Sequence, residues 1–212
     1  MAYFIVFEGL DGTGKSSLMQ ALSEELKRRD QPYYLTREPG GTALGEALRP
    51  LILDRSGPAP SPRAELLLYE ASRAQHVDEV IQPKLAAKTW VLSDRFSASS
   101  IAFQAGGREL PLSHVEWLNE FATGGLQPDL TVLLDFSAEE ARARRNGRSA
   151  RGGEEEDRIE SEADAFHERV RQGFLEQAER DTGRWLVLSA RETPEKLKEA
   201  LLAELKGRHW LD

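Results

Sequence analysis

The fold of this chain is decided by the stretch Ile5-Val6-Phe7-Glu8-Gly9-Leu10-Asp11-Gly12-Thr13-Gly14-Lys15-Ser16-Ser17. This stretch reads as a buried strand that runs into a glycine-rich loop and then into a helix. Its spacing fits the phosphate-binding pattern G-x-x-x-x-G-K-[ST]. In that pattern the backbone N–H groups of the loop surround a phosphate, the lysine adds positive charge and the hydroxyl holds Mg²⁺.

The residues on either side of the loop support this interpretation. Tyr3 to Phe7 is an apolar run, as expected of a buried strand in a parallel sheet, and Leu18, Leu22 and Leu26 form an apolar helical stripe. The alternative is a plain glycine turn between two elements, which would account for neither the apolar strand before the loop nor the leucine stripe after it. We therefore predict a nucleotide site in which Ser16 also binds Mg²⁺. The residues expected to contact the ATP phosphates are Gly9, Leu10, Asp11, Gly12, Thr13, Gly14, Lys15, Ser16 and Ser17.

Composition limits the remaining possibilities. The 212 residues are enough for one domain with a sizeable core, and the formal net charge of -8 argues against a general nucleic-acid-binding surface. There are no cysteines, which excludes disulfides and thiolate metal sites. No apolar run approaches the roughly 20 residues of a membrane span, and no signal peptide precedes the first strand. We expect a soluble, cytoplasmic protein.

Apolar runs alternate with helical patterns along the chain, which is typical of a doubly wound α/β fold with a parallel sheet. The expected strands are Tyr3–Phe7, Tyr33–Leu35, Trp90–Ser93, Leu130–Asp135 and Trp185–Leu188. Charged residues follow the strands repeatedly, as in Thr36-Arg37-Glu38-Pro39-Gly40-Gly41-Thr42 and Asp94-Arg95-Phe96. Ligands of such sheets bind beyond the carboxyl ends of the strands, so we expect the site there.

Two segments interrupt the alternation. The segment 54–62 is rich in proline and predicts a loop, because proline lacks the N–H that a continuous helix needs. The segment 142–158 is dense in charge, with arginines first and an acidic run after them. Neither segment is long enough to link two domains.

The motifs in this order and spacing resemble those of thymidylate kinases. The matching pieces are Phe7-Glu8-Gly9-Leu10-Asp11-Gly12-Thr13-Gly14-Lys15-Ser16, Thr36-Arg37-Glu38-Pro39-Gly40-Gly41-Thr42, Ser93-Asp94-Arg95-Phe96 and Asp157-Arg158-Ile159-Glu160. The resemblance covers nearly the whole chain. It implies the P-loop NTPase and nucleoside monophosphate kinase fold: a single domain, 1–212, whose five-stranded parallel sheet is flanked by helices and carries a mobile lid at about 142–158.

The same resemblance implies the activity and its partners. Thymidylate kinases phosphorylate dTMP with Mg²⁺ and ATP, giving dTDP for dTTP biosynthesis, and they are usually cytoplasmic homodimers. Asp94 follows a buried strand, and this position places it to join Ser16 at the metal. The resemblance assigns Arg95 to the dTMP phosphate, and Arg37, beside Gly40 and Gly41, is the second candidate for that phosphate. The residues expected to bind dTMP are Asp11, Arg37, Glu38, Pro39, Tyr69, Arg73, Arg95, Ser99, Ser100, Phe103 and Gln104.

Several of these assignments have a structural alternative. Tyr69 and Arg73 share one helix face, where the family has an aromatic that stacks on thymine and an arginine that donates to its O4 atom. A tyrosine beside leucines is, however, often a core residue. Asp94 and Arg95 alone could form a salt bridge, and Asp11 could cap a turn. Glu8 is as well suited to supporting the loop as to catalysis.

Phosphoryl transfer also needs an arginine that neutralises the moving group. Gly12 and Thr13 occupy the variable loop positions and neither is basic, so the family pattern assigns this charge to the lid. We favour Arg148 and Arg151 as catalytic residues together with Lys15 and Arg95. The alternative for some lid arginines is a solvated, charged loop. The lid arginines are Arg144, Arg145, Arg148, Arg151 and Arg158.

Other functions remain open from the sequence. The first is a kinase for another nucleotide or nucleoside. The second is a GTP-dependent switch protein, although the Asn-Lys-x-Asp string typical of guanine recognition is absent from the sequence. The third is a nucleotide-binding protein without activity, against which the motif residues Lys15, Ser16, Asp94 and Arg95 argue.

Overall fold

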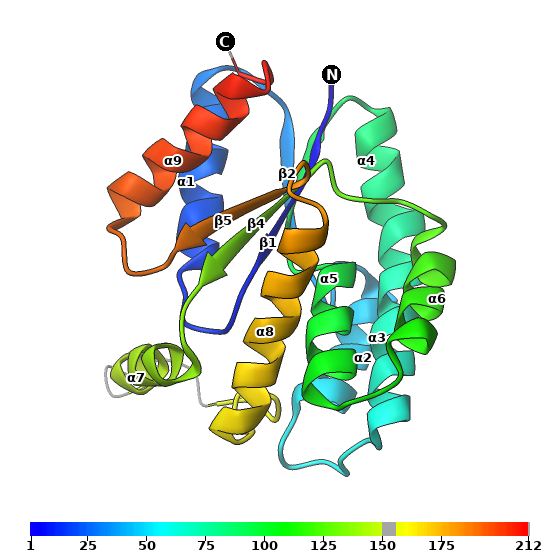
Figure 1. Ribbon diagram of the computed structural model, residues 1–212. Helices are drawn as coiled ribbons and strands as arrows, with labels where there is room; N and C mark the ends of the chain where they lie inside the picture. Colours follow the sequence, from blue (N-terminus) through cyan, green and yellow to red (C-terminus); the bar gives the residue numbers. More distant parts are fainter. Residues whose placement is uncertain (150–155, 212) are drawn as a thin grey trace.

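A parallel sheet forms the centre of the molecule (Figure 1). The computed structural model describes residues 1–149 and 156–211, and for 145–149 the description covers the backbone. Within that part of the chain the sheet has five strands in the order β2-β3-β1-β4-β5, and every neighbouring pair is parallel. The strands are β1 (Phe4–Glu8), β2 (Tyr33–Arg37), β3 (Trp90–Asp94), β4 (Leu130–Asp135) and β5 (Trp185–Ser189). The sequence-based prediction of a five-stranded parallel sheet is confirmed.

Helices cover both faces of this sheet, with α1 and α9 on one side and α3 to α6 on the other (Figure 1). The helices are α1 (Lys15–Arg28), α2 (Ala43–Leu53), α3 (Pro62–His76), α4 (Gln82–Ala86), α5 (Ser97–Ser100), α6 (Leu112–Thr123), α7 (Ala138–Ser149), α8 (Asp164–Arg180) and α9 (Pro194–Gly207). The π-helical segments η1 (Val77–Ile81) and η2 (Ile101–Gly107) continue the chain after α3 and α5.

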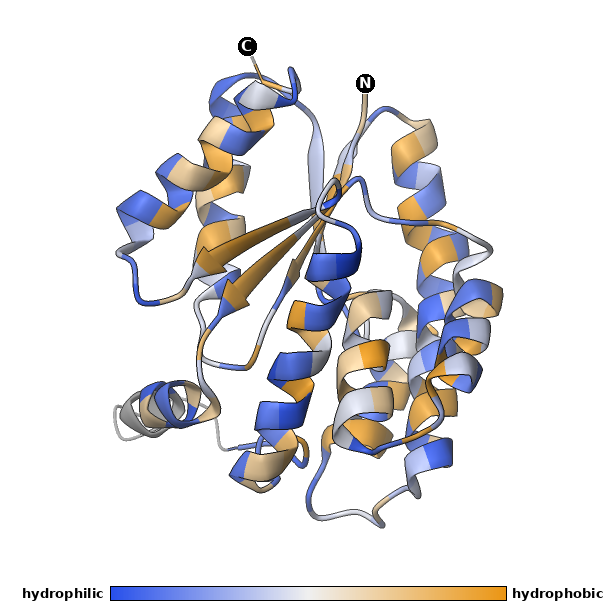
Figure 2. Cartoon of the chain, viewed as in Figure 1, coloured by the Kyte–Doolittle hydropathy of each residue, from blue (hydrophilic) through white to orange (hydrophobic). Residues whose placement is uncertain are grey.

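The core follows from the alternation of side chains along the strands. In β1, Ile5 and Phe7 belong to the cluster that includes the leucine stripe of α1, whereas Phe4 and Val6 pack with Val77 of η1. Strand side chains point alternately to opposite faces, so an all-apolar strand must be covered on both sides. Figure 2 shows the strands as largely hydrophobic ribbons between helices of mixed character.

The two irregular segments behave differently. α2 ends at Leu53 and α3 begins at Pro62, so the proline-rich stretch connects two helices as predicted. The charged segment, in contrast, is partly helical, because α7 runs to Ser149. Its start is fixed by Ser137 and Glu140. The Ser137 N–H donates to the Glu140 carboxylate at 3.1 Å, and the Glu140 N–H donates to the Ser137 hydroxyl at 3.3 Å.

The carboxyl ends of β1, β2 and β3 meet at one edge of the sheet. The phosphate loop leaves β1, Glu38 follows β2, and Arg95 follows β3. The register pairs Arg37 with Asp94 and Phe7 with Asp94, so these segments begin side by side. The helices of the described ranges are all too short or too polar to cross a bilayer.

Candidate active site

The phosphate loop is held in a conformation that requires glycine. Gly9 has φ 131°, and a Cβ atom there would lie 2.5 Å from the carbonyl oxygen of Leu134. Gly14 has φ 102° and directly precedes α1. The Lys15 Nζ atom reaches back and donates to the carbonyl oxygens of Gly9 and Leu10, both at 3.2 Å. The loop therefore curls around the ammonium group at the start of a helix, where an anion is favoured.

Asp11 lies where two cations converge. Arg95 Nη2 donates to both carboxylate oxygens of Asp11, at 2.8 and 2.9 Å, and Lys15 Nζ donates to one of them at 3.3 Å. Burial alone would raise the pKa of Asp11, but Arg95 and Lys15 overcome it and hold that pKa well below its usual range. One anionic group thus lies between the cation of the phosphate loop and the cation that follows β3.

The residues predicted to hold Mg²⁺ are brought together. The Ser16 hydroxyl donates to Asp94 Oδ2 at 3.3 Å, and Asp94 Oδ1 is buried with no hydrogen-bond partner in the part of the chain that the structure describes. A hydroxyl and an orphaned carboxylate oxygen fit Mg²⁺, which prefers oxygen ligands and keeps several waters or phosphate oxygens. Among the described residues no group of three His, Asp or Glu side chains forms a protein-only metal cage.

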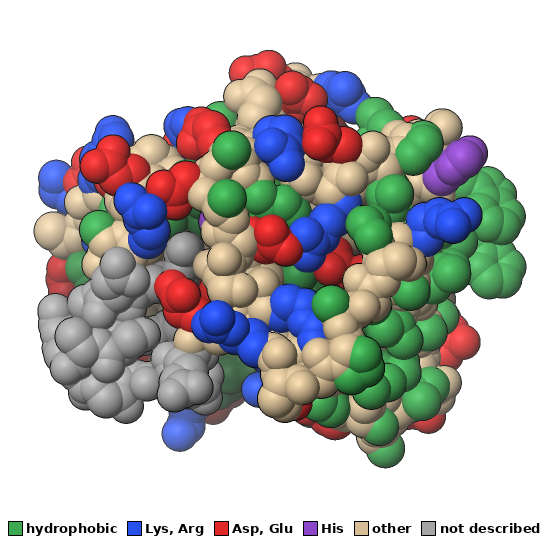
Figure 3. All heavy atoms as spheres, turned by 90° about the horizontal axis from the view of Figure 1, so that it is seen from below, with side chains coloured by type: hydrophobic (Ala, Val, Ile, Leu, Met, Phe, Trp, Pro, Cys, Tyr) green, Lys and Arg blue, Asp and Glu red, His purple; other side chains and the backbone are tan. Residues whose placement is uncertain are grey.

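A cavity of about 120 Å³ opens beside these groups. Its lining includes every residue that was predicted to bind dTMP except Arg73. The lining residues are Asp11, Arg37, Glu38, Pro39, Arg49, Leu53, Tyr69, Asp94, Arg95, Ser99, Ser100, Phe103, Gln104, Asp157 and Ile159. Seen from the carboxyl ends of the strands, acidic and basic side chains mingle at the centre of this surface (Figure 3).

Two aromatic side chains line the cavity from different elements. Tyr69 comes from α3 and Phe103 from η2, and the Arg95 guanidinium lies 4.9 Å from the centre of the Phe103 ring. Burial, and then the nearby Glu65 carboxylate, raise the pKa of Tyr69, so its phenol stays protonated at neutral pH. The two aromatic side chains give the cavity an apolar wall, and this wall ends at the Arg95 guanidinium, a group that is suited to binding a phosphate.

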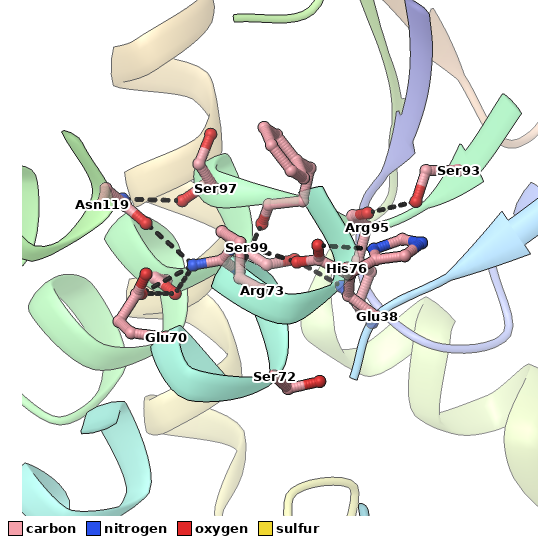
Figure 4. A network of polar contacts seen from close by, with 12 residues as sticks. Glu38, Glu70, Ser72, Arg73, His76, Ser93, Arg95, Ser97, Ser99 and Asn119 are labelled. Carbon is pink, nitrogen blue, oxygen red and sulfur yellow. Dashed lines mark hydrogen bonds and ion pairs between the residues drawn. The ribbon is translucent and has the colours of Figure 1, made fainter. Parts of the chain in front are cut away.

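Arg73 lies behind the cavity in a buried polar network (Figure 4). Its Nε atom donates to Glu38 at 2.8 Å, and its Nη1 atom donates to Glu70, Ser100 and Asn119 at 2.6 to 2.8 Å. Ser100 and Glu38 themselves line the cavity. The guanidinium is thus one hydrogen bond away from the cavity, and its direct contact with a base stays a prediction.

His76 extends the same network to β2. Its Nδ1 atom lies 3.0 Å from Glu38 Oε1, and its Nε2 atom lies 2.7 Å from the Thr36 hydroxyl. The ring is completely buried. Glu38 is therefore held on both carboxylate oxygens, by Arg73 and by His76, and its place in the cavity wall is fixed.

The cavity wall also contains four residues that were not predicted from the sequence, namely Arg49, Leu53, Asp157 and Ile159. Arg49 and Leu53 stand four residues apart on α2, a spacing that places them on one helix face and could have indicated a shared surface. Arg49 also donates to the carbonyl oxygen of Pro39 at 2.7 Å. Asp157 and Ile159 belong to the piece Asp157-Arg158-Ile159-Glu160 that carried the resemblance, but neither had been assigned to the site.

The described arginines of the charged segment 142–158 have different surroundings. Arg144 lies over the Phe136 ring, 4.6 Å from its centre, and Arg142 pairs with Asp164 at 2.9 Å. Arg158 donates to carbonyl oxygens of the loop after α2, those of Asp54, Gly57 and Pro58. Arg158 is therefore used to hold that loop. Arg151 and the side chains of Arg145 and Arg148 lie outside the described residues.

Glu8 is completely buried at the end of β1. Its carboxylate accepts hydrogen bonds from the Phe96 N–H at 3.0 Å and from the Ser99 hydroxyl at 2.7 Å. Burial raises the pKa of Glu8 from 4.5 to about 7, against the opposing effects of Arg95, these hydrogen bonds and Lys15.

We expect Glu8→Gln to remove a pH dependence of stability. Between pH 4.5 and about 7 the folded protein keeps a proton on Glu8 that the unfolded chain releases, so the free energy of unfolding falls as pH rises. Glutamine has no such proton. In urea unfolding, the stability of the variant relative to the original protein should increase by about 2 to 3 kcal/mol from pH 5 to pH 8. An equal difference at both pH values would contradict the raised pKa.

Comparison with known proteins gives consistent matches to one family. The family model described as thymidylate kinase matches residues 7–201. A thymidylate kinase of Bdellovibrio bacteriovorus is 64% identical over 205 residues, which cover 97% of this chain and 96% of that relative. A thymidylate kinase of Geotalea daltonii is 43% identical, with 98% of each chain covered. The crystal structure of thymidylate kinase from Ehrlichia chaffeensis superposes with a TM-score of 0.76 at 29% identity, covering 97% of this chain and 98% of that one.

Proposed function

The chain belongs to the thymidylate kinase family and phosphorylates dTMP to dTDP, and we propose that the phosphoryl group comes from Mg·ATP bound at the phosphate loop. Lys15 and the loop amides bind the outer phosphates of ATP. Ser16 and Asp94 would hold Mg²⁺, and the ion would supply neutralisation of the phosphate charge. The product, dTDP, is the substrate of the next phosphorylation, which gives dTTP.

The observation that carries this proposal is the bridging position of Asp11. Lys15 on the donor side and Arg95 on the acceptor side both contact its carboxylate, at 3.3 and 2.8 Å. Two phosphate-binding cations therefore lie close enough to grip adjoining phosphates of a donor and an acceptor. Transfer between phosphates needs chiefly such positioning and charge neutralisation, and no covalent enzyme intermediate. Asp11 is then free to turn toward the sugar hydroxyl of dTMP.

The cavity beside Arg95 binds the nucleoside part of dTMP in this proposal. Tyr69 and Phe103 provide aromatic contact for the base, while Arg95 and Arg37 bind the phosphate. Four polar residues and one proline complete the wall of the cavity, and these are Glu38, Pro39, Ser99, Ser100 and Gln104. Arg73 stands behind Ser100 as a cationic donor, which suits the carbonyl oxygen of thymine better than the amino group of cytosine.

An ADP-release assay with a panel of acceptors tests the proposal. With Mg·ATP we expect fast release for dTMP, slower release for dUMP, and near-background rates for dCMP, UMP and thymidine. Release that does not depend on the acceptor would contradict coupled transfer, and a fast rate with another monophosphate would favour that substrate.

For Arg73→Ala the preference for dTMP over dCMP should decrease, and an unchanged preference would leave Arg73 with a purely structural role.

We also propose that two copies of the chain form a homodimer through α2, α3 and α6. These helices pack side by side and carry large hydrophobic side chains that are about half exposed or more. The side chains are Leu44, Leu51, Leu67, Trp117 and Phe121. In Figure 3 hydrophobic side chains gather along the right-hand edge, the side on which α6 lies in Figure 1. Burial of such an apolar surface against the same surface of a second copy would remove it from water and stabilise a dimer.

The dimer is tested by placing charge on this face. Trp117 and Phe121 stack with ring centres 5.9 Å apart and are 65% and 76% exposed, so replacing both with glutamate should leave the fold intact but yield a monomer. Light scattering after size exclusion measures the mass. Val187→Glu, at a 46% exposed hydrophobic position on β5, is the matched control and should remain dimeric. A variant that keeps the mass of the original protein would contradict this face.

Family membership bears on the alternatives that the sequence left open. A GTP-dependent switch and a kinase for another nucleotide both lack support from the relatives, which carry the description thymidylate kinase. We propose the cytoplasm as the location, since both nucleotide substrates occur there. The mobile lid and the catalytic use of its arginines belong to the same proposal.

A further inference from the structure

Arg95 has an unusual backbone conformation for an arginine. Its φ angle is 73°, in the left-handed region that side chains with a Cβ atom avoid. Neighbouring groups hold the peptide units around it. The Arg95 N–H donates to the carbonyl oxygen of Phe7 at 3.0 Å, and the Ser93 hydroxyl donates to the carbonyl oxygen of Arg95 at 2.8 Å (Figure 4). Such a conformation persists only when its surroundings over-determine it.

Glu8 contributes the contact on the other side of this turn. The amide that directly follows Arg95, the Phe96 N–H, donates to Glu8 Oε1 at 3.0 Å. Glu8 Oε2 accepts from the Ser99 hydroxyl at 2.7 Å and lies 3.7 Å from Arg95 Nη1. The Ser99 oxygen in turn accepts from Arg95 Nη1 at 3.3 Å. One carboxylate therefore holds both the backbone and the guanidinium of Arg95.

Glu8 is not placed to touch a nucleotide. It is completely buried, and the lining of the substrate cavity does not include it. Arg95 and Ser99, which it contacts, both line that cavity. An effect of Glu8 on the substrate must therefore pass through these neighbours.

We propose that Glu8 is a positioning residue that fixes the left-handed turn at Arg95 and thereby aims the guanidinium at the phosphate of the acceptor nucleotide. The proposal rests on the proposed role of Arg95 as the ligand of that phosphate. It answers the question that the sequence left open, because it gives Glu8 a role in binding dTMP without contact with the reacting atoms.

Three substitutions separate geometry from charge. Glu8→Ala removes the acceptor of the Phe96 N–H and should weaken dTMP binding about tenfold to a hundredfold, as loss of a supporting contact does at other sites. Glu8→Gln keeps an acceptor oxygen at full length and should stay within about threefold of the original affinity. Glu8→Asp keeps the charge but is one methylene too short, and should behave like alanine. ATP affinity, measured in the same titrations, should not change in any of them.

The opposite pattern would overturn the proposal. If the glutamine variant binds dTMP as weakly as the alanine variant, charge and not the acceptor geometry is what Glu8 provides. A parallel loss of ATP and dTMP affinity would indicate a general structural role. Should the alanine variant fail to fold, the comparison of glutamine with aspartate still decides between these outcomes.

A double-mutant cycle shows whether the effect passes through Arg95. In an Arg95→Ala background, Glu8→Ala should change dTMP affinity by less than about twofold, because the group that it positions is gone. An equal loss in both backgrounds would overturn the proposal. The cycle also separates the two levels of inference. If Arg95→Ala alone leaves dTMP binding unchanged, the proposed role of Arg95 fails, whereas a loss there without any effect of Glu8→Ala defeats only the positioning role.

Discussion

Arg95→Ala should lower kcat/KM for dTMP by about three orders of magnitude, which corresponds to about 4 kcal/mol of transition-state stabilisation. The guanidinium is only 14% exposed and lies on the Asp11 carboxylate at 2.8 Å. A planar guanidinium binds a phosphate through two parallel hydrogen bonds, and it does so more strongly where water is excluded. Under the proposed role of Arg95, the substitution removes this pair of donors from the phosphate of dTMP.

The loss in kcat/KM should exceed that expected for a single phosphate contact, because the substitution also leaves acidic groups without one of their cationic partners. Asp11 and Glu8 are both compensated by Arg95, at 2.8 and 3.7 Å. In the alanine variant the Asp11 carboxylate, which lines the cavity, loses one of its cationic partners and repels the incoming phosphate, and truncating one partner of a buried charged pair costs about 2 to 5 kcal/mol. Arg95→Lys should give an intermediate loss, because an ammonium keeps the charge but not the planar pair of donors.

Arg37→Ala is the matched control for Arg95→Ala. Arg37 also lines the cavity, but its side chain is 54% exposed and pairs with the 47% exposed Glu46 at 3.1 Å. Solvent screens such a group, so we expect at most about a tenfold loss in kcat/KM. Steady-state kinetics with dTMP as the varied substrate measures both. Equal losses for the two arginines would contradict the central position that we give to Arg95.

Arg148→Ala or Arg151→Ala should lower kcat by about 10³, while the affinity for dTMP changes by less than about threefold. The reason is electrostatic. Charge builds up on the transferring phosphoryl group only near the transition state, so an arginine that contacts it acts on kcat and not on ground-state binding. The phosphate loop offers no substitute, because Gly12 and Thr13 carry no charge.

Two arginines of the same charged segment serve as controls. Arg142 pairs with Asp164 at 2.9 Å, and Arg158 is bound to carbonyl oxygens of the loop after α2. Their alanine variants should keep kcat within about threefold. The ion pair of Arg142 is exposed and contributes little, and the described hydrogen bonds of Arg158 go to a loop backbone. Single-turnover and steady-state measurements on all four variants separate chemistry from product release. Full turnover in both Arg148→Ala and Arg151→Ala would show that the neutralising charge comes from elsewhere.

Features that depend on neighbours in the chain were predictable from the sequence. The strand, glycine loop and helix at Ile5 to Ser17 can be recognised as a phosphate-binding motif, because the glycines and the lysine lie within one short segment. The alternation of apolar runs and helices predicted the parallel sheet, and the rule that ligands bind at its carboxyl edge predicted which segments meet. Nearly all of the predicted dTMP residues line one cavity for this reason.

Features that depend on contacts between distant segments could not be predicted from the sequence. Arg73 looked like a cavity residue from its helical spacing with Tyr69, yet Glu38, Ser100 and Asn119, from elements far apart in the sequence, hold its guanidinium behind the wall. Arg49 reaches the cavity only because α2 packs against α3. The extension of α7 into the charged segment 142–158 was not predicted either, since such a density of charge is also typical of a solvated loop.

The sequence by itself determined the fold class, the phosphate loop and the family, because local backbone requirements and hydrophobic periodicity are written in consecutive residues. Only the tertiary structure decided which charges meet. It placed Asp11 between Lys15 and Arg95, and it placed the buried carboxylate of Glu8 against the turn at Arg95. The contact of Arg95 with Asp11 joins residues 84 positions apart in the chain, and the contact of the Phe96 N–H with Glu8 joins residues 88 positions apart. Electrostatic energies depend on distance and burial in space, and neither quantity exists until the chain has folded.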